Sequence, residues 1–263
     1  MAKQQRARSR GFRPPRKRPP SAPASEILYG INPVEEALLA RRRRLKRLVL
    51  KEDARSERLT RIQHLAAGLG LFPERLPLGD LELLANSPHH QGVALDCGPL
   101  PRRSEHEALA AASAPDALFV ALDQVEDPQN LGAVVRNCAV FGINGLVVPR
   151  DHSAPLSPAA SKASAGRIER FEVYEVANLA RFLDSCRDRR VWVAGTDEAG
   201  DVALPGFRQP RPLMIVLGNE GRGLRHLVRE KCDYVLSIPT PGEGSLNIAS
   251  ASAVILYHLT CTQ

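Results

Sequence analysis

From residue 117 to the end of the chain, short apolar runs alternate with stretches of helical spacing, and this alternation constrains the fold more than any other feature. Strands separated by helices predict a mostly parallel sheet covered by helices on both faces. The 263 residues also leave room for a second domain, because single domains commonly hold roughly 100–200 residues. The predicted fold class is therefore α/β.

Strands of this region are expected at 117–122, 145–148, 171–173, 191–195, 213–217 and 234–238, and helices at 131–141, 158–165, 178–187, 223–231 and 246–259. A smaller alternating unit lies upstream, with strands expected at 45–50, 72–76 and 92–95 and helices at 33–40, 56–69 and 81–85. Asn32 before Pro33 has the residue types of a helix N-cap and first turn. We therefore predict a tail over 1–25, a small domain over 26–97, a linker with a short helix over 98–116, and a second domain over 117–263.

The excess positive charge is concentrated at the N-terminus. Eight of the 36 Lys and Arg residues lie in positions 1–25, which contain no acidic residue, and the rest of the chain holds 28 basic against 29 acidic residues. A Pro-rich stretch with so little apolar content is expected to be disordered, and its charge suits a phosphate backbone. A second basic cluster, Arg41–Arg44 with Lys46 and Arg47, also favours a nucleic-acid partner.

The cysteines and the apolar runs exclude several classes of protein. The five cysteines are odd in number and widely spaced, which argues against a disulfide framework and against a structural metal site. Each is expected to be a small buried hydrophobe: Cys97, Cys138, Cys186, Cys232 and Cys261. No apolar run reaches the roughly 18 residues of a membrane span, and prolines follow the basic N-terminus where a signal peptide would be apolar. We expect a soluble, cytoplasmic protein without a metal.

Common catalytic and nucleotide-binding motifs are absent from the sequence: it has no Gly-x-Gly-x-x-Gly, Walker, Gly-x-Ser-x-Gly or His-Glu-x-x-His segment. Polar residues at the ends of the expected strands are then the best candidates for a site. Open α/β sheets bind their ligands at the carboxyl ends of the strands.

Three polar clusters meet this criterion. In the first, Asp127 to Asn137, Asn130 suits a helix N-cap and Arg136 points away from the apolar stripe, so a cap and a solvated arginine are the simplest interpretations. The second, Leu217 to Gly223, holds three glycines around Glu220, more than a plain turn needs. In the third, Ile238 to Asn247, Ser245 could be an N-cap, which leaves Asn247 unexplained. The helix that follows begins with small residues and could pack closely against another segment.

The order and spacing of these clusters closely resemble the motifs of the SpoU/TrmH branch of the SPOUT methyltransferases, from Leu122 to Tyr257. The segments Tyr29–Ala37 and His90–Val93 resemble the ribosomal-protein-L30e-like substrate domain of these enzymes. Together the two regions look most like the RlmB-like guanosine 2′-O-methyltransferases of 23S rRNA. The segment Pro241–Gly244 departs from the family pattern, because it is shorter and more acidic.

The resemblance implies an RNA 2′-O-ribose methyltransferase that uses S-adenosyl-L-methionine, with a C-terminal trefoil knot and a homodimeric assembly. It implies a cofactor site lined by Gly218, Ile238 and Leu246, and catalytic or supporting roles for Asn130, Arg136, Glu220, Ser245 and Asn247. A guanidinium keeps its proton far above neutral pH. We therefore expect Arg136 to hold a phosphate and stabilise the developing alkoxide, with a general-base role left open.

Two alternatives stay open at this point. Transfer RNA is the alternative substrate, because related enzymes with the same motifs methylate it. A non-catalytic RNA-binding factor in ribosome assembly is the alternative from another class, and degenerate motifs would favour it. All five polar positions are intact, which favours an enzyme.

Removal of residues 1–25 is expected to flatten the salt dependence of RNA binding, because each phosphate neutralised by the tail releases counterions. The measurement compares the slope of log affinity against log salt for the full and shortened chains. Equal slopes would show that the tail does not contact RNA.

Overall fold

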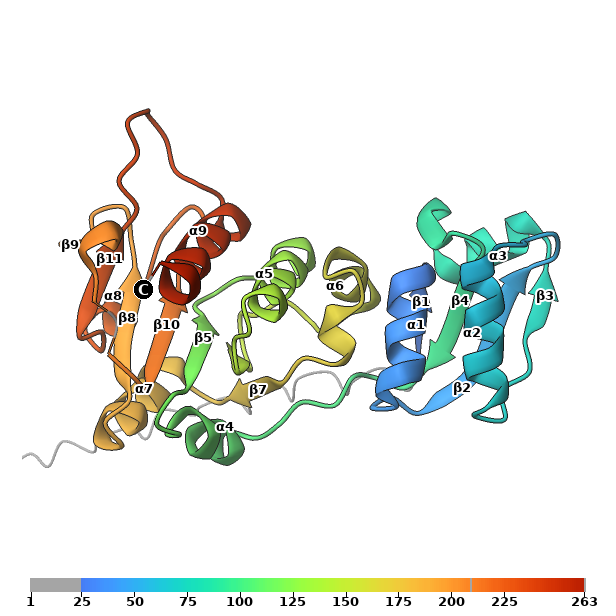
Figure 1. Cartoon of the computed structure of the whole chain (residues 1–263), viewed down its shortest axis with the longest axis horizontal. Helices are drawn as coiled ribbons and strands as arrows, with labels where there is room; N and C mark the ends of the chain where they lie inside the picture. The colour runs from blue at the N-terminus through green and yellow to red at the C-terminus, as the bar shows by residue number, and fades with distance from the viewer. Residues whose placement is uncertain (1–24, 209, 263) are drawn as a thin grey trace, which may run out of the picture.

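The computed structural model describes residues 25–208 and 210–262, so the predicted tail lies outside the described residues except for Ser25. The chain forms two α/β units that lie side by side, each built on its own sheet (Figure 1). The expectation of an α/β protein with a parallel sheet is confirmed.

The first unit is a four-stranded sheet in the order β1-β4-β2-β3, with helices packed against it. Its elements are β1 (Glu26–Tyr29), α1 (Ile31–Ala40), β2 (Leu45–Lys51), α2 (Glu57–Ala67), β3 (Glu74–Leu76), α3 (Leu78–Ala85), the 3₁₀ turn η1 (Pro88–His90) and β4 (Val93–Cys97). Strand β1 is not among the expected strands, because four residues are too few to show a clear alternation. It pairs antiparallel with β4, far away in the sequence.

Asn32 is not the N-cap of α1, so that prediction was wrong. The helix begins at Ile31, after Gly30, whose φ of 91° favours glycine. The Asn32 side chain accepts a hydrogen bond from Arg58 of α2 instead. Pro33 still lies in the first turn, where its missing N–H has no helical partner to lose.

The second unit is a seven-stranded sheet in the order β7-β6-β5-β10-β8-β11-β9, in which every recorded pair of strands is parallel. Its strands are β5 (Leu118–Leu122), β6 (Gly145–Pro149), β7 (Val173–Val176), β8 (Trp192–Thr196), β9 (Val202–Ala203), β10 (Leu213–Leu217) and β11 (Tyr234–Ser237). Its helices and 3₁₀ turns are α4 (Glu105–Ala112), α5 (Pro128–Val140), α6 (Pro158–Ala163), η2 (Arg167–Glu169), α7 (Leu179–Asp188), η3 (Leu204–Gly206), α8 (His226–Arg229) and α9 (Ile248–Cys261).

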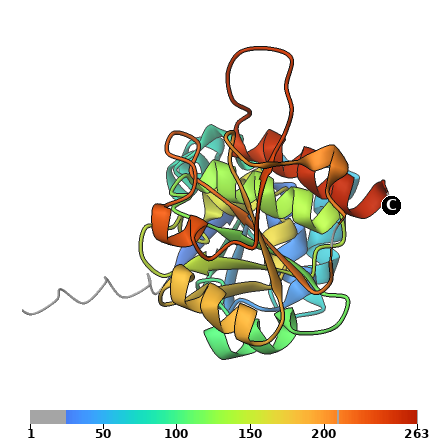
Figure 2. The same cartoon turned by 90° about the vertical axis from the view of Figure 1, so that its left-hand side faces the viewer.

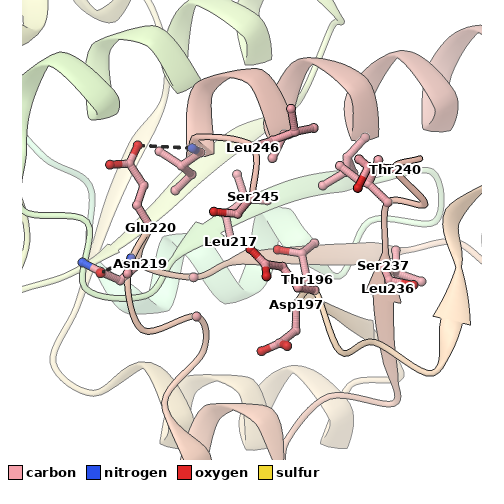
Figure 3. Close-up of a pocket in the computed structure, with 18 of the residues that line it drawn as sticks. Thr196, Asp197, Leu217, Asn219, Glu220, Leu236, Ser237, Thr240, Ser245 and Leu246 are labelled. Carbon is pink, nitrogen blue, oxygen red and sulfur yellow. Dashed lines mark hydrogen bonds between the residues drawn. The ribbon is translucent and has the colours of Figure 1, made fainter. Parts of the chain in front are cut away.

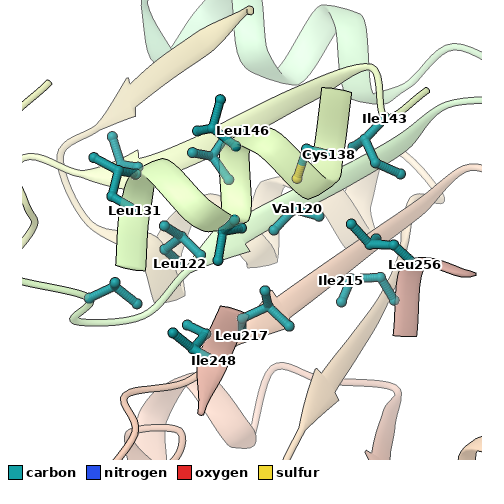
Figure 4. Packing of buried hydrophobic residues seen from close by; sticks show 14 of the residues in the cluster. Val120, Leu122, Leu131, Cys138, Ile143, Leu146, Ile215, Leu217, Ile248 and Leu256 are labelled. Atoms are coloured by element: carbon teal, nitrogen blue, oxygen red, sulfur yellow. The ribbon is translucent and has the colours of Figure 1, made fainter. Parts of the chain in front are cut away.

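Helices cover both faces of this sheet, because every central strand is apolar on both sides. On one face α5, α6 and α9 pack on side chains such as Val120, Leu146 and Ile215 (Figure 4). On the other face α4, α7 and α8 pack on Phe119 and Met214, among others. Figure 2 views this unit along the long axis of the molecule, with the loop between β11 and α9 projecting from the body.

Several boundaries differ from the expected ones for local reasons. Helix α5 begins at Pro128 because Asp127 caps it, accepting a hydrogen bond from the backbone N–H of Gln129. Helix α8 is shorter than expected, because the residues before it form a closed loop that ends at Gly223. The expected linker holds α4, and Arg103 before it pairs with the outer strand β7 at Tyr174.

The two units are joined by a buried ion pair. The guanidinium of Arg43 donates to Glu169 at 2.6 Å, and their side chains are 0% and 1% exposed. Arg43 also donates to Glu26 at 2.7 Å and to the carbonyl oxygen of Gly98 at 3.0 Å, while Ser161 donates to Glu169 at 2.7 Å. Burial disfavours the charged guanidinium, but the hydrogen bonds to Glu169 and Glu26 and the negative charge of Glu169 together outweigh this, and the pKa of Arg43 lies above its ordinary value.

The basic cluster around Arg43 therefore has a different role from the one its composition favoured. Arg42 donates to the carbonyl oxygen of Phe171 at 2.6 Å, which adds a second contact between the units. Lys46 and Arg47 form ion pairs with Asp96 and Glu74. Much of this charge is used to hold the fold together, and less of it is available for RNA than the sequence indicates.

All five cysteines are free thiols. Cys97, Cys138 and Cys186 are buried, and burial raises the pKa of Cys97 and of Cys186 to about 12. Cys232 is partly buried. Cys261 is exposed, so the expectation that it is a buried hydrophobe was wrong. It is the last residue of α9, and the end of this helix extends beyond the core.

Replacing Arg43 with Met is expected to lower the free energy of unfolding by about 3–5 kcal/mol, because it leaves Glu169 buried without its cation. The double variant Arg43→Met/Glu169→Gln is expected to recover part of this loss, since glutamine is neutral and still accepts from Ser161. Urea unfolding of the three proteins measures the effect. A single variant as stable as the wild type would show that the ion pair does not hold the units together.

Candidate functional site

A cavity with a volume of about 580 Å³ opens at the carboxyl ends of three neighbouring strands, β8, β10 and β11 (Figure 3). Three loop segments and the first turns of α9 line it. The first two segments are residues 196–198 and 217–223, and the third, between β11 and α9, contributes residues 236–240 and 244–246. The second and third polar clusters of the sequence therefore meet at one site, as the position of strand ends in a parallel sheet requires.

The loop after β10 is closed by its own backbone. The N–H of Asn219 donates to the carbonyl oxygen of Gly223 at 3.0 Å, and the N–H of Gly223 donates back at 2.9 Å. A Cβ at Gly218 would lie 2.5 Å from the carbonyl carbon of Gly223, so glycine is required where the two ends of the loop pass each other. Gly223 has a φ of 62°, which also favours glycine.

A buried carboxylate fixes the far end of the same loop. Asp123 follows β5 and is 0% exposed. It accepts hydrogen bonds from the backbone N–H of Arg225 at 2.9 Å and from its guanidinium at 2.7 Å. The side chain of Asn219 donates to the carbonyl oxygen of Gln124 at 2.9 Å. The loop is thus held on the neighbouring strand as well as on its own.

The third cluster is tied to the second by Glu220. Its carboxylate accepts a hydrogen bond from the backbone N–H of Ile248 at 3.2 Å, at the start of α9. The N-cap of this helix is Asn247, whose side chain accepts from the N–H of Ser250 at 2.8 Å. The cap is therefore Asn247, and Ser245 is an exposed residue that lines the cavity.

Of the predicted site residues, Gly218, Glu220, Ile238, Ser245 and Leu246 line this cavity, and Asn247 lies directly beside it. Asn130 and Arg136 lie on α5 and do not line it. Asn130 is in the first turn of α5 but is not its N-cap, so the cap interpretation was wrong.

Arg136 is exposed, as predicted, and opens into a second cavity between the two units. Within the described part of the chain, no hydrogen bond or ion pair is recorded for its side chain.

Sequence reasoning missed the segment Thr196, Asp197 and Glu198, which lines the cavity after β8. These residues meet the same criterion as the other clusters, because polar side chains directly follow an expected strand. Glycines flank the segment as well, at Gly195 and Gly200, so the signal for a site was present in the sequence.

Neither a membrane span nor a metal site is found in the described part of the chain. No helix there is both long and apolar enough to cross a membrane, and no group of three His, Cys, Asp or Glu residues is placed to hold a metal ion.

Comparison with known proteins identifies both units. Residues 117–257 match the family model described as the SpoU rRNA Methylase family, and residues 27–103 match the model described as RNA 2′-O ribose methyltransferase substrate binding. The two descriptions together define an RNA-modifying enzyme with a catalytic unit and a substrate-binding unit. The chain belongs to the SpoU rRNA methylase family and is an RNA 2′-O-ribose methyltransferase.

Individual relatives agree with this assignment. A protein of Mycobacterium avium described as an uncharacterized tRNA/rRNA methyltransferase is 38% identical over 256 residues, covering 97% of this chain and 83% of its own. A protein of Mycobacterium ulcerans with the same description is 39% identical over 256 residues, covering 97% and 82%. The crystal structure of the SpoU methyltransferase AviRb from Streptomyces viridochromogenes, in complex with AdoMet, superposes with a TM-score of 0.76 at 25% identity, covering 91% and 90%.

Proposed function

We propose that this enzyme methylates the ribose 2′-hydroxyl of a guanosine in 23S rRNA, in the cytoplasm, with S-adenosyl-L-methionine bound in the cavity at the ends of β8, β10 and β11. The observation that carries the proposal is the convergence of two family motifs on that one cavity, where Glu220 holds the second to the third. The relative AviRb, which was solved with AdoMet, has the same fold.

The residues of the cavity fit S-adenosyl-L-methionine. Its volume of about 580 Å³ falls in the usual range for small ligands of roughly 300–1,000 Å³. Leu217, Leu236 and Ile238 offer an apolar wall for an adenine ring. Asp197 and Glu220 bring negative charge to a ligand that carries a sulfonium and an ammonium group. When bound, the cofactor supplies a methyl group to the attacking ribose oxygen.

The protein's own contribution is mainly positioning. Glu220 and Asn247 order the start of α9, so that Ser245 and Leu246 line the cavity. We assign Arg136 to the RNA: its planar guanidinium can hold a phosphate at two points and stabilise negative charge on the 2′-oxygen. Asn130, on the same helix, supports Arg136 and the nucleotide in this proposal.

Because Arg136 does not line the cofactor cavity of its own chain, we propose a homodimer in which Arg136 of one subunit serves the cofactor of the other. Helices α5 and α9 supply a surface for this contact. Val140, Val254 and Tyr257 are 70%, 42% and 54% exposed, unusually open for large apolar side chains. The two helices are held together by Asn137, which donates to Ala249 at 2.8 Å and to Ser252 at 2.9 Å.

Ribosomal RNA is preferred over transfer RNA because of the substrate-binding unit and the description of the family. Transfer RNA is the second candidate, since the Mycobacterium relatives are described as tRNA/rRNA methyltransferases. A non-catalytic role in ribosome assembly is disfavoured by the formed cavity and its intact polar residues.

The purified protein is expected to transfer label from S-adenosyl-L-methionine to RNA and not to DNA of the same sequence, because only RNA carries the 2′-hydroxyl. Alkaline hydrolysis should leave the modified linkage uncut, since cleavage needs a free 2′-hydroxyl. Ribosomal and transfer RNA are compared as substrates. Label on a base, or equal transfer to DNA, would overturn the assignment.

Gly218→Ala is expected to raise the Kd for S-adenosyl-L-methionine roughly tenfold or more, because overpacking costs about 1–3 kcal/mol and the clash is with backbone. Isothermal titration calorimetry measures the change. The matched control is Gly206→Ala, where a Cβ meets nothing within 4 Å. Equal affinities for both variants would place the cofactor elsewhere.

Arg136→Ala is expected to lower kcat by about 100-fold or more, with cofactor binding and thermal stability near normal, because an exposed arginine adds little to the core. Arg136→Lys should restore little, since an ammonium lacks the planar fork. Mixed dimers of Arg136→Ala and Gly218→Ala chains are isolated with two affinity tags and assayed at a cofactor concentration well below the raised Kd, where the Gly218→Ala homodimer is nearly inactive. They are expected to regain one working site. Mixed dimers as inactive as both parents would show that the site is not shared.

A further inference from the structure

The second cavity is lined by Arg136 and by residues of both units, which lie side by side in Figure 1. It has a volume of about 340 Å³. Its lining comes from both sides: Asn32, Glu35, Glu36 and Arg58 from the first unit, and Arg136, Val140, Ala165 and Arg167 from the second. We call this cavity the junction cleft. Arg136, the residue assigned to RNA, thus faces its own chain's substrate-binding unit.

Two carboxylates organise the arginines around the junction cleft. Glu35, whose side chain is 12% exposed, accepts from Arg58 at 3.1 Å and from Arg61 at 2.9 Å. Glu36, 16% exposed, pairs with two arginines of the second unit, Arg167 at 3.3 Å and Arg170 at 3.5 Å. With Arg136 there are five cations against two anions.

Four of these guanidiniums are held by a carboxylate and are also partly exposed to solvent. The side chains of Arg58, Arg61, Arg167 and Arg170 are 54%, 65%, 53% and 58% exposed. A guanidinium has five N–H donors, and the recorded bonds to these carboxylates use only some of them. Because more than half of each side chain is exposed, donors remain for the planar, two-point binding of a phosphate group.

Stability alone does not account for this arrangement. Exposed ion pairs are worth about 0–1 kcal/mol each, and the two units are already joined through the buried Arg43 and Glu169. An excess of cations raises the repulsion within the cluster, and this repulsion is relieved when a polyanion binds.

We propose that the RNA strand bearing the target ribose passes through the junction cleft, where Arg58 and Arg167 hold its phosphates beside Arg136 of the same chain. This inference rests on the shared site proposed above. Each substrate-binding unit then presents RNA to its own Arg136, and the methyl group comes from the cofactor held by the partner subunit.

The first test uses the homodimer with Arg58→Ala/Arg167→Ala. The KM for RNA should rise roughly tenfold. The negative slope of log affinity against log salt should become shallower by roughly 1.4–1.8, as expected for two lost phosphate contacts. The kcat and the Kd for S-adenosyl-L-methionine should not change. The matched control is Arg181→Ala/Arg189→Ala, two exposed arginines of α7 and its end, far from the cleft. An unchanged KM and slope would overturn the proposal.

The second test asks which chain needs the cleft. In mixed dimers of Arg136→Ala and Gly218→Ala chains, the one working site uses Arg136 of the Gly218→Ala chain. Adding Arg58→Ala/Arg167→Ala to that chain should raise the KM for RNA about as much as in the homodimer. Adding the same pair to the Arg136→Ala chain should leave the KM near that of the parent mixed dimer.

The outcomes separate the two proposals. Equal effects in both chains, or an effect only in the Arg136→Ala chain, would overturn the pairing of cleft and Arg136 while the shared site stands. A parent mixed dimer without activity would contradict the shared site itself, and this inference would fall with it.

Discussion

Parallel strands end at the same edge of their sheet, so the loops after β8, β10 and β11 have to share that edge. The strand order makes these three strands neighbours, and the cavity that we propose for the cofactor is built from the loops that follow them. Asp123 and Glu220 then hold the loops in register, from the neighbouring strand β5 and across to α9. The shape of the site is therefore a consequence of topology, which a few hydrogen bonds make rigid.

The second constraint is the buried pair of Arg43 and Glu169. It fixes the substrate-binding unit against α6 and η2, which in turn lie on α5, the helix that carries Arg136. Because the pair is buried and also held by Glu26 and Ser161, the unit is docked on the methyltransferase unit as well as tethered by its linker. The fold therefore fixes the positions of the two units on either side of the junction cleft.

Local patterns predicted the core strands well. The expected strand 213–217 matches β10, because an apolar run between Pro212 and Gly218 allows few alternatives. Long-range pairing was harder to predict. Strand β1 pairs with a strand far along the chain. Strand β10, which follows both β5 and β8 in the sequence, lies between them in the sheet. The trefoil knot that the resemblance implies stays a prediction.

In the candidate site, too, local patterns were predictable from the sequence and long-range contacts were not. Gly218 and Glu220 were found because glycines and a carboxylate follow a clear strand. Asp197 also follows a strand, between Gly195 and Gly200, but it lies outside the three polar clusters that resemble the family motifs. Nothing local separates Arg43, fully buried, from the exposed Arg41 and Arg44 beside it in the sequence. Arg136 belongs to the same set of family motifs as the residues of the proposed cofactor cavity, so nothing in the sequence indicated that the two lie apart. Only the tertiary structure separates them.

In the proposed mechanism, each chain has two separate binding regions, one for the cofactor and one for RNA. Hydrogen exchange of the wild-type enzyme tests this directly, with S-adenosyl-L-methionine and RNA added in turn. The cofactor alone should protect backbone amides in 217–223 and 236–246 and leave those of 31–36 and 165–170 unchanged, and RNA should then protect the latter. Protection of 31–36 by the cofactor alone, or none in 217–223, would contradict it.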